Sequence, residues 1–205
     1  MDMSGRTILV TGASTGIGRA VAVLTAALGA RVILNGRNVE GLNVTLKSMA
    51  DEGHIIAAFD LSDMDAIAPW MKALSQDHGL LNGVVHCAGI QVTKPVRNVD
   101  EAFFDETMRT NLGSALALAR GYRQKACKGS PAAMVFVSSI AGLIGQPGNA
   151  VYAASKGGLI SATRALAVEF LRDDIRVNAV APALVETEMS SKARAGMTTE
   201  QYQYM

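Results

Sequence analysis

The sequence predicts an α/β protein built on a doubly wound parallel sheet. Short β-branched and apolar runs recur along the chain, and a longer helical pattern follows almost every one of them, as in βαβ units. Runs such as Met134–Val137 are continuously apolar, which is typical of strands covered on both faces. The composition, with 49% hydrophobic and 18% charged residues, predicts a compact globule.

The elements follow one another in regular alternation. The strands are expected at Thr7–Val10, Arg31–Leu34, Ile55–Phe59, Gly83–His86, Ala132–Val137 and Arg176–Val180. The helices are expected near Gly16–Leu28, Val39–Asp51, Met64–Gln76, Glu101–Lys125 and Val151–Leu171. The chain shows no internal repeat, low-complexity tract or linker, so residues 1–205 are expected to form a single domain.

Charge and cysteine content restrict the partners and the compartment. The 19 basic and 18 acidic residues give a net charge of +1, which argues against nucleic acid or a membrane surface as the main partner. The charge-free stretch Gly129–Ser155 is interpreted as a buried strand, a loop and a helix start because polar residues interrupt it. Two cysteines, Cys87 and Cys127, suit a reducing cytoplasm. His54 and His78 have no partner at ligand spacing, so no metal site is predicted.

A glycine-rich turn follows the first strand. Its sequence, Thr11-Gly12-Ala13-Ser14-Thr15-Gly16-Ile17-Gly18, has the spacing Gly-x-x-x-Gly-x-Gly. Glycines there allow backbone N–H groups and a helix N-terminus to approach a pyrophosphate, whose charge the helix dipole favours. The alternative is a turn without a ligand. Its position between a strand and a helix favours a nucleotide site.

The chain resembles the short-chain dehydrogenase/reductase family, and most closely its 3-oxoacyl-acyl-carrier-protein reductase branch. The matching motifs run in the family's order over nearly the whole chain: Thr11–Gly18, Asp60-Leu61, Cys87-Ala88-Gly89, Asn111, Ser139, Tyr152-x-x-x-Lys156 and Val177–Pro182. The resemblance implies a Rossmann-type fold, hydride transfer with a nicotinamide cofactor, and a homo-oligomer, either a dimer or a tetramer.

The end of the second strand favours NADP(H). A site for NAD usually places a carboxylate about 20 residues past the glycines to hold the ribose hydroxyls. Here Gly36 occupies that place and Arg37 follows, and a guanidinium binds a 2′-phosphate well. The alternative is that Arg37 is an ordinary surface arginine.

The remaining cofactor contacts are implied by the resemblance. Asp60 and Leu61 would hold the adenine, and Thr187 would hold the carboxamide, while Asp60 could instead cap the following helix, a role open also to Ser62 or Asp63. The full predicted set is Gly12, Ser14, Thr15, Gly16, Ile17, Gly18, Arg37, Asn38, Asp60, Leu61, Cys87, Ala88, Gly89, Tyr152, Lys156, Pro182, Val185 and Thr187.

The predicted catalytic residues are Asn111, Ser139, Tyr152 and Lys156. Tyr152 and Lys156 are four residues apart, so they share one helix face, and the ammonium is expected to lower the phenol pKa. The resemblance implies that Tyr152 is the general acid/base, that Ser139 orients the substrate oxygen and that Lys156 also holds the nicotinamide ribose. It implies that Asn111 holds a water in a proton relay. Ser138 is the rival serine, but the family's serine lies thirteen residues before the tyrosine, which selects Ser139.

Three departures from the family pattern stand out. The family's Asn-Asn-Ala-Gly is His86-Cys87-Ala88-Gly89 here, and we interpret His86 and Cys87 as packing residues. The family's Pro-Gly is Pro182-Ala183, which strains Ala183 if that position needs a positive φ. Family members usually continue through another helix and strand. We therefore expect the strand ending at Val180 to lie at a sheet edge and the natural protein to be longer, or its missing end to be supplied otherwise.

The sequence thus predicts an NADPH-dependent oxidoreductase acting between a ketone and a secondary alcohol. The substrate would be a small molecule or carrier-bound, with a 3-oxoacyl thioester, a steroid, a sugar and a small ketone as candidates. Segments Ile90–Val99, Ile140–Val151 and Leu184–Met205 are expected to contact it, and Lys94 and Arg97 could meet an acidic carrier. The alternative from another class is a catalytically silent NADP(H)-binding regulatory or scaffold protein.

Overall fold

The structure is a computed structural model that describes residues 1–50 and 52–195. Six parallel strands form one sheet in the order β3-β2-β1-β4-β5-β6. The strands are β1 (Thr7–Thr11), β2 (Arg31–Gly36), β3 (Ile55–Ala58), β4 (Leu81–His86), β5 (Lys128–Val137) and β6 (Ile175–Val180). This order confirms the doubly wound sheet, and it places the topological switch point between β1 and β4. Within the described residues, β6 forms one edge of the sheet, as predicted.

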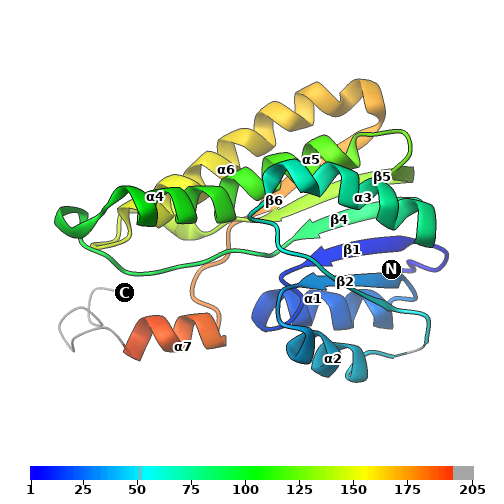
Figure 1. The fold of residues 1–205 in the computed structure, drawn as a ribbon, viewed down its shortest axis with the longest axis horizontal. Helices are drawn as coiled ribbons and strands as arrows, with labels where there is room; N and C mark the ends of the chain where they lie inside the picture. The colour runs from blue at the N-terminus through cyan, green and yellow to red at the C-terminus, as the bar shows by residue number, and fades with distance from the viewer. Residues whose placement is uncertain (51, 196–205) are drawn as a thin grey trace.

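Helices cover both faces of the sheet (Figure 1). α1 (Gly16–Ala27) and α2 (Val39–Lys47) pack on one face, and their apolar side chains form one core cluster with β1 and β2. The opposite face carries α3 (Met64–His78), α4 (Glu101–Met108), α5 (Ser114–Tyr122) and α6 (Ala150–Glu169). A short helix, α7 (Glu188–Ala195), follows β6. The sequence did not predict α7, since its apolar content is low.

The expected helix Glu101–Lys125 is wrong as one continuous helix. A π-helical turn, Arg109–Gly113, separates α4 from α5, and α5 ends at Tyr122. Hydrogen-bond spacing that widens for one turn leaves little trace in an apolar pattern, so the sequence could not reveal it. The other boundaries differ by a few residues: α2 ends at Lys47 rather than Asp51, which itself lies outside the described residues, and β5 begins earlier.

Side-chain caps define where three helices begin. The carboxylate or amide oxygens of Asn38, Asp63 and Asp100 accept hydrogen bonds from backbone N–H groups three residues later, at distances of 3.0, 3.2 and 2.8 Å. The cap of α3 is therefore Asp63, so Asp60 does not cap that helix and remains available to the candidate cofactor site.

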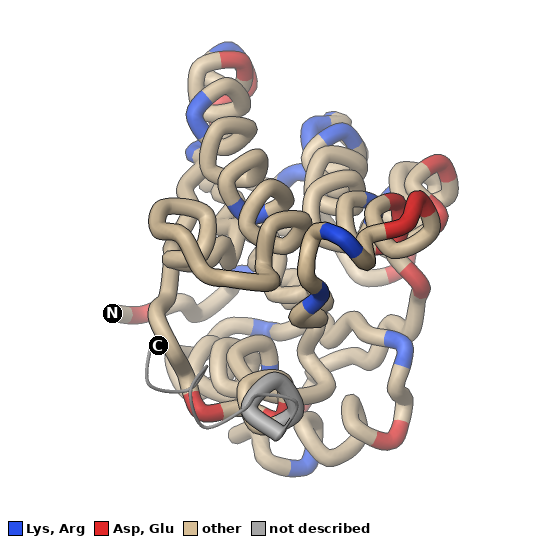
Figure 2. Tube along the Cα trace, turned by 90° about the vertical axis from the view of Figure 1, so that its left-hand side faces the viewer, with Lys and Arg blue, Asp and Glu red and all other residues tan. Residues whose placement is uncertain are grey.

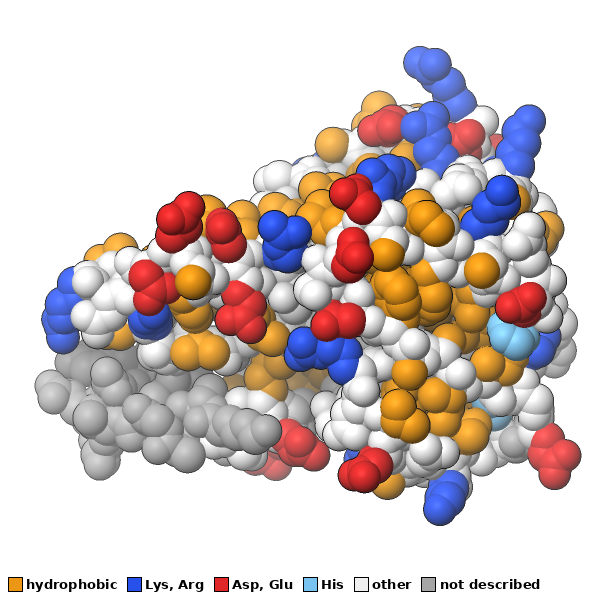
Figure 3. Space-filling view, viewed as in Figure 1, with side chains coloured by type: hydrophobic (Ala, Val, Ile, Leu, Met, Phe, Trp, Pro, Cys, Tyr) orange, Lys and Arg blue, Asp and Glu red, His pale blue; other side chains and the backbone are white. Residues whose placement is uncertain are grey.

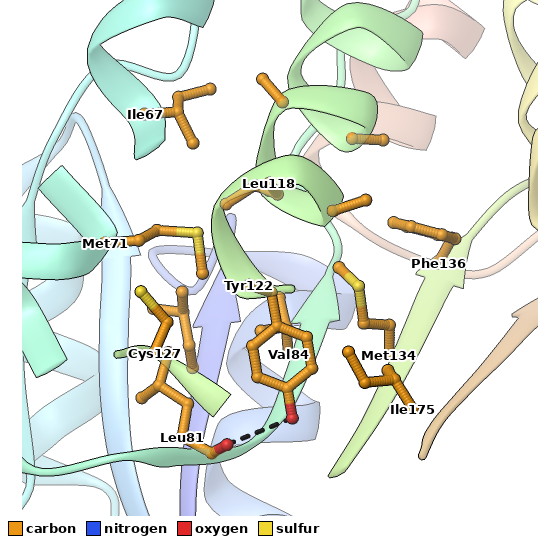
Figure 4. Close-up of a cluster of buried hydrophobic side chains, with 14 of the residues drawn as sticks. Ile67, Met71, Leu81, Val84, Leu118, Tyr122, Cys127, Met134, Phe136 and Ile175 are labelled. Carbon is orange, nitrogen blue, oxygen red and sulfur yellow. Dashed lines mark hydrogen bonds between the residues drawn. The ribbon is translucent and has the colours of Figure 1, made fainter. Parts of the chain in front are cut away.

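The larger core cluster lies between the sheet and α3, α5 and α6 (Figure 4). Tyr122, at the end of α5, is fully buried in it, and its hydroxyl donates a 3.1 Å hydrogen bond to the carbonyl oxygen of Leu81. Burial raises the pKa of Tyr122 above its ordinary range, so the phenol stays protonated and keeps this donor. The bond ties the end of α5 to the start of β4.

We expect Tyr122→Phe to lower the free energy of unfolding by about 1 kcal/mol, because it removes one buried hydrogen bond and leaves the aromatic packing in place. Urea denaturation followed by circular dichroism would measure the change. A variant as stable as the wild type would show that the Leu81 carbonyl finds another donor.

The surface carries charges of both signs without a dominant patch. Lys and Arg residues are scattered among Asp and Glu residues along the chain (Figure 2). On the face shown in Figure 3, acidic and basic side chains lie beside exposed hydrophobic ones. Among the described residues, no helix combines the length and the apolar character needed to cross a bilayer.

Candidate active site

The main cavity, of about 540 Å³, lies beyond the carboxyl ends of β1, β2 and β4, at the switch point of the sheet. All the predicted cofactor residues except Pro182 and Val185 line it, and those two line a smaller cavity next to it. The prediction missed several lining residues that have no distinctive motif: Asn35, Phe59, Ser62, Ile90, Thr110, Val137, Ser138 and Met189. Most of them lie at or just after strand ends, whereas Thr110 lies in the π turn and Met189 in α7, which no sequence motif would indicate.

The glycine turn after β1 brings backbone close to backbone. Gly12 has a φ of +63°, and a Cβ atom there would lie 2.8 Å from the backbone nitrogen of Ala88. A Cβ on Gly18 would lie 2.1 Å from the carbonyl oxygen of Gly12. α1 begins at Gly16, its cap residue Thr15 makes no side-chain capping bond, and its first turn has no acidic residue. The first N–H groups of α1 therefore lack side-chain caps at the cavity wall, where an anion fits.

We expect Gly18→Ala to destabilise the fold by about 3 kcal/mol or more, because the added methyl group would overlap the Gly12 carbonyl and displace the turn. Chemical denaturation of the variant and the wild type measures this difference in the free energy of unfolding directly. Gly145→Ala is the matched control, since no heavy atom lies within 4 Å of a Cβ there. Equal stability of the two variants would contradict the close packing described here.

The far end of the cavity holds Arg37 and Asp60. Their side chains are 69% and 52% exposed, and Arg37 Nη1 lies 3.7 Å from Asp60 Oδ2. The pKa of Asp60 is lowered mainly by the backbone hydrogen bond from Ser62, and less by Arg37. At the end of β2, Gly36 presents no side chain, although a Cβ there would make only ordinary contacts of 3.4 Å or longer. This end of the cavity therefore offers a guanidinium and lacks a carboxylate on β2.

Ser139, Tyr152 and Lys156 meet where the two cavities adjoin. Tyr152 lines both cavities, Lys156 lines the larger one, and Ser139 lines the smaller one. The Lys156 ammonium lies 5.8 Å from the centre of the Tyr152 ring and donates a 2.9 Å hydrogen bond to the carbonyl oxygen of Val137. Ser139 shares a side-chain hydrogen bond with Tyr152. Ser138, the rival serine, donates its hydroxyl to the Lys156 carbonyl oxygen and so supports α6.

Asn111 lies in the π turn and is fully buried, and it lines neither cavity. Its amide nitrogen donates to the Ile90 carbonyl oxygen and to Ser155 Oγ, at 2.9 and 3.0 Å, and its amide oxygen accepts from Ile90 N–H at 2.8 Å. A Cβ on Gly89 would lie 3.1 Å from Asn111 Oδ1 and 3.4 Å from Lys156 Nζ. Asn111 therefore holds the segment after β4 in place beside the lysine.

The model of the short chain dehydrogenase family matches residues 6–198. The chain belongs to this family. Gluconate 5-dehydrogenase of Gluconobacter oxydans is 32% identical over 193 residues, which cover 93% of this chain and 75% of that protein. The 3-oxoacyl-[acyl-carrier-protein] reductase of Vibrio cholerae is 33% identical, covering 93% of this chain and 78% of its own length.

A solved structure from Sinorhizobium meliloti, described as a short-chain alcohol dehydrogenase, superposes with a TM-score of 0.88. It is 37% identical, and the match covers 99% of this chain and 80% of that one. The fold and the oxidoreductase family are thereby confirmed. These sequence identities, 32% to 37%, identify the family but neither the substrate nor the choice between NAD and NADP.

Burial dominates the electrostatics of this short-chain dehydrogenase. Desolvation lowers the pKa of Lys156 to about 8. The pKa of Tyr152 is raised by burial, although the hydrogen bond with Ser139 acts in the opposite sense. The expected net lowering of the tyrosine pKa is therefore wrong, because burial outweighs the opposing contribution, and Tyr152 carries its proton at neutral pH.

His86 stands where the family has an asparagine, and both nitrogens of its ring are hydrogen-bonded. Thr11 Oγ1 accepts from Ala88 N–H and lies 2.8 Å from His86 Nδ1, so the threonine hydroxyl donates to that nitrogen. Ser114 donates to the Thr110 carbonyl oxygen, which leaves His86 Nε2–H to donate to Ser114 Oγ over 3.2 Å. Desolvation, then the nearby Lys156 charge, lowers the histidine pKa to about 3, which keeps the ring neutral. His86 is a structural residue, as predicted.

Cys87, from the same departure as His86, and Ala183 have simple outcomes. Cys87 lines the main cavity, and burial raises the pKa of its thiol to about 12, so it is a poor nucleophile. Asp174 is the sole non-glycine residue with a positive φ in the part of the chain that is described, so Ala183 carries no such strain. This position needs no positive φ, so alanine in place of the family's glycine causes no backbone strain there.

Proposed function

We propose that this chain is an NADPH-dependent oxidoreductase that interconverts a ketone and a secondary alcohol. The observation that carries the proposal is the meeting of Ser139, Tyr152 and Lys156 on the wall between the two cavities. One cavity is long and ends in backbone N–H groups and a guanidinium, while the other is small and adjoins the phenol. A proton donor between a cofactor cavity and a second cavity suits carbonyl reduction.

The residues of the main cavity fit NADP(H). The open N-terminus of α1 suits the pyrophosphate, and Arg37 suits the 2′-phosphate, which no carboxylate on β2 would repel. Bound there, the nicotinamide would supply or accept the hydride. Asp60 pairs with Arg37 at its side and lies where the adenosine half would rest.

The chain's own residues would manage the proton. Tyr152, protonated at neutral pH, would donate its phenol proton to the carbonyl oxygen, which Ser139 would orient by hydrogen bonding. The phenolate left behind would be stabilised by the Lys156 ammonium, whose charge lies 5.8 Å from the ring centre. Asn111 would act through the segment it holds rather than by touching the reacting atoms.

This arrangement predicts a loss of ketone reduction in alkaline solution. Because the Lys156 pKa is about 8, the ammonium is present below that pH and is lost above it. We expect kcat/KM to be level below about pH 8 and to fall roughly tenfold per pH unit above it, as for one essential proton. Initial rates of NADPH oxidation across that range would test this, with Tyr122→Phe as a control of unchanged profile. A flat profile through pH 9.5 or so would contradict the role of the ammonium.

The function itself is tested by a turnover screen. Purified protein would be mixed with NADPH or NADH and with ketones of several classes, including small and cyclic ketones, keto sugars and a 3-oxoacyl thioester. We expect NADPH-dependent turnover with at least one class. The competing candidate is a silent NADP(H)-binding regulatory or scaffold protein, and it predicts tight NADPH binding without turnover in any class.

We further propose a homo-oligomer, a dimer or a tetramer, working in the cytoplasm on a small-molecule or carrier-bound carbonyl substrate. Two glycines of α6 face other parts of the same chain rather than open space. Gly157 packs against Gly142, and Gly158 packs against Leu112, both within the same chain. The exposed apolar side chains Val168 and Leu171 near the end of α6 instead support association.

A further inference from the structure

The smaller cavity is the natural place for the substrate, if the proposed function holds. It has a volume of about 120 Å³ and adjoins Ser139 and Tyr152. Among the described residues that line it, none is charged, and its polar side chains carry only hydroxyl or amide groups. The described residues that line it are Ile17, Gln91, Ser138, Ser139, Ile140, Ala141, Gln146, Tyr152, Pro182, Ala183, Leu184, Val185, Thr187, Met189 and Ser190. Lys156, on the wall between the two cavities, lines the main cavity and is not among the described residues that line this one.

Apolar side chains gather on the three segments that border this cavity. They follow β4, β5 and β6, and each is between 40% and 75% exposed: Val92, Val96, Leu143, Ile144, Leu184, Val185 and Met189. Single exposed apolar residues are common on protein surfaces, but such a concentration beside one cavity is typical of a ligand-binding surface. It would bury an apolar group that extends from the reacting carbonyl.

Gln146 is the amide of the cavity whose orientation the structure defines. Its Oε1 accepts a 2.9 Å hydrogen bond from Nδ2 of Asn149, a residue only 2% exposed at the start of α6. Among the described residues, no acceptor takes a hydrogen bond from the NH₂ group of Gln146. The side chain therefore presents a neutral donor to the cavity, which suits a carbonyl or ester oxygen of the substrate.

The charges nearest these segments do not favour an anion. Lys94 pairs with Asp100 at 2.7 Å and lies over the Phe103 ring at 4.7 Å, so its charge is already compensated. Arg97 is exposed on the same segment but does not line the cavity.

We propose that the substrate is an uncharged ketone, or its secondary alcohol, with an apolar group beside the carbonyl, and that carboxylates are disfavoured because no described residue lining the cavity carries a positive charge. A charged group taken out of water without a partner is heavily penalised, whereas an ester of the same shape is not. The proposal rests on the proposed function for the reaction, but its binding part can be tested separately.

The test uses methyl 4-oxocyclohexanecarboxylate and the corresponding free acid, which share a ring and a ketone and differ in charge. With NADPH, we expect the wild type to favour the ester by about 100-fold or more in kcat/KM, as for an unpaired charge in a site without a cation. Gln146→Lys should reduce that preference by about tenfold or more, while Gln146→Met, which adds no charge, should keep it. Equal use of acid and ester by the wild type would overturn the proposal.

A binding measurement separates this inference from the reaction. Calorimetric titration of both compounds into the Tyr152→Phe variant saturated with NADPH reports the cavity's preference without turnover. Tighter binding of the ester supports the inference even if the wild type turns over neither compound, a result that would count against the proposed function alone. Equal or tighter binding of the acid overturns the inference whatever the turnover results.

Discussion

Replacing Tyr152 by phenylalanine will reduce ketone-dependent NADPH oxidation by about a thousandfold or more, within the range that a lost general acid costs. The substitution removes one hydroxyl group and leaves the buried ring in place between the two cavities. No other phenol among the described residues lines either cavity, so no ready substitute can supply the proton. The steady-state rate at saturating NADPH is the measurement.

NADPH binding should change little in that variant, because the phosphate-binding turn and Arg37 are untouched. Fluorescence titration of NADPH would establish this, and it separates a lost proton donor from a damaged cofactor site. Tyr122→Phe makes the same chemical change in the core and should keep full turnover. Wild-type turnover by the Tyr152 variant would refute its assignment as the general acid.

Placing a carboxylate at the end of β2, through Gly36→Asp, will shift the preference from NADPH toward NADH by about 100-fold or more. The carboxylate would repel a 2′-phosphate and pair with Arg37, and it could instead accept hydrogen bonds from the ribose hydroxyls. A side chain fits there, since its Cβ would contact Leu42 at 3.4 Å and Ser14 at 3.6 Å. The ratio of kcat/KM for the two cofactors is the readout.

Gly36→Asn separates charge from shape, because asparagine has nearly the same size as aspartate and no charge. We expect it to keep the preference for NADPH, with at most a modest general loss of affinity. If both variants shift the preference equally, the selectivity depends on space at Gly36 rather than on electrostatics. If the wild type already prefers NADH, the assignment of Arg37 to a 2′-phosphate is wrong.

The sheet and the glycine-rich turn after β1 were predictable because they rest on local chemistry. β-branched runs specify strands, and the glycines of the turn are required by approaches as close as that between Gly18 and the Gly12 carbonyl. Because the carboxyl ends of parallel strands lie at the same edge of the sheet, residues that directly follow different strands are expected to lie close together. The residues of the predicted cofactor site, apart from Pro182 and Val185, accordingly line one cavity.

What the sequence could not reveal depends on three-dimensional surroundings. The pKa of Tyr152 depends on how deeply the ring is buried, and the sequence alone suggested only the effect of the lysine. The conformation of Ala183 is a backbone property that a family comparison cannot decide. The apolar border of the smaller cavity combines three loops, and loop residues carry no periodic pattern that would place them together.

The π turn between α4 and α5 also affects how the length of this chain can vary. Such a turn holds about one residue more than a regular helical turn, so it absorbs a single added residue without rotating the helix that follows. Deleting one residue from Arg109–Gly113 would therefore restore regular helix and leave α5, with Tyr122, facing the core much as before. The change would fall on Asn111, whose three hydrogen bonds hold the segment after β4 in place. A single-residue deletion here is thus a change to the candidate site rather than to the core.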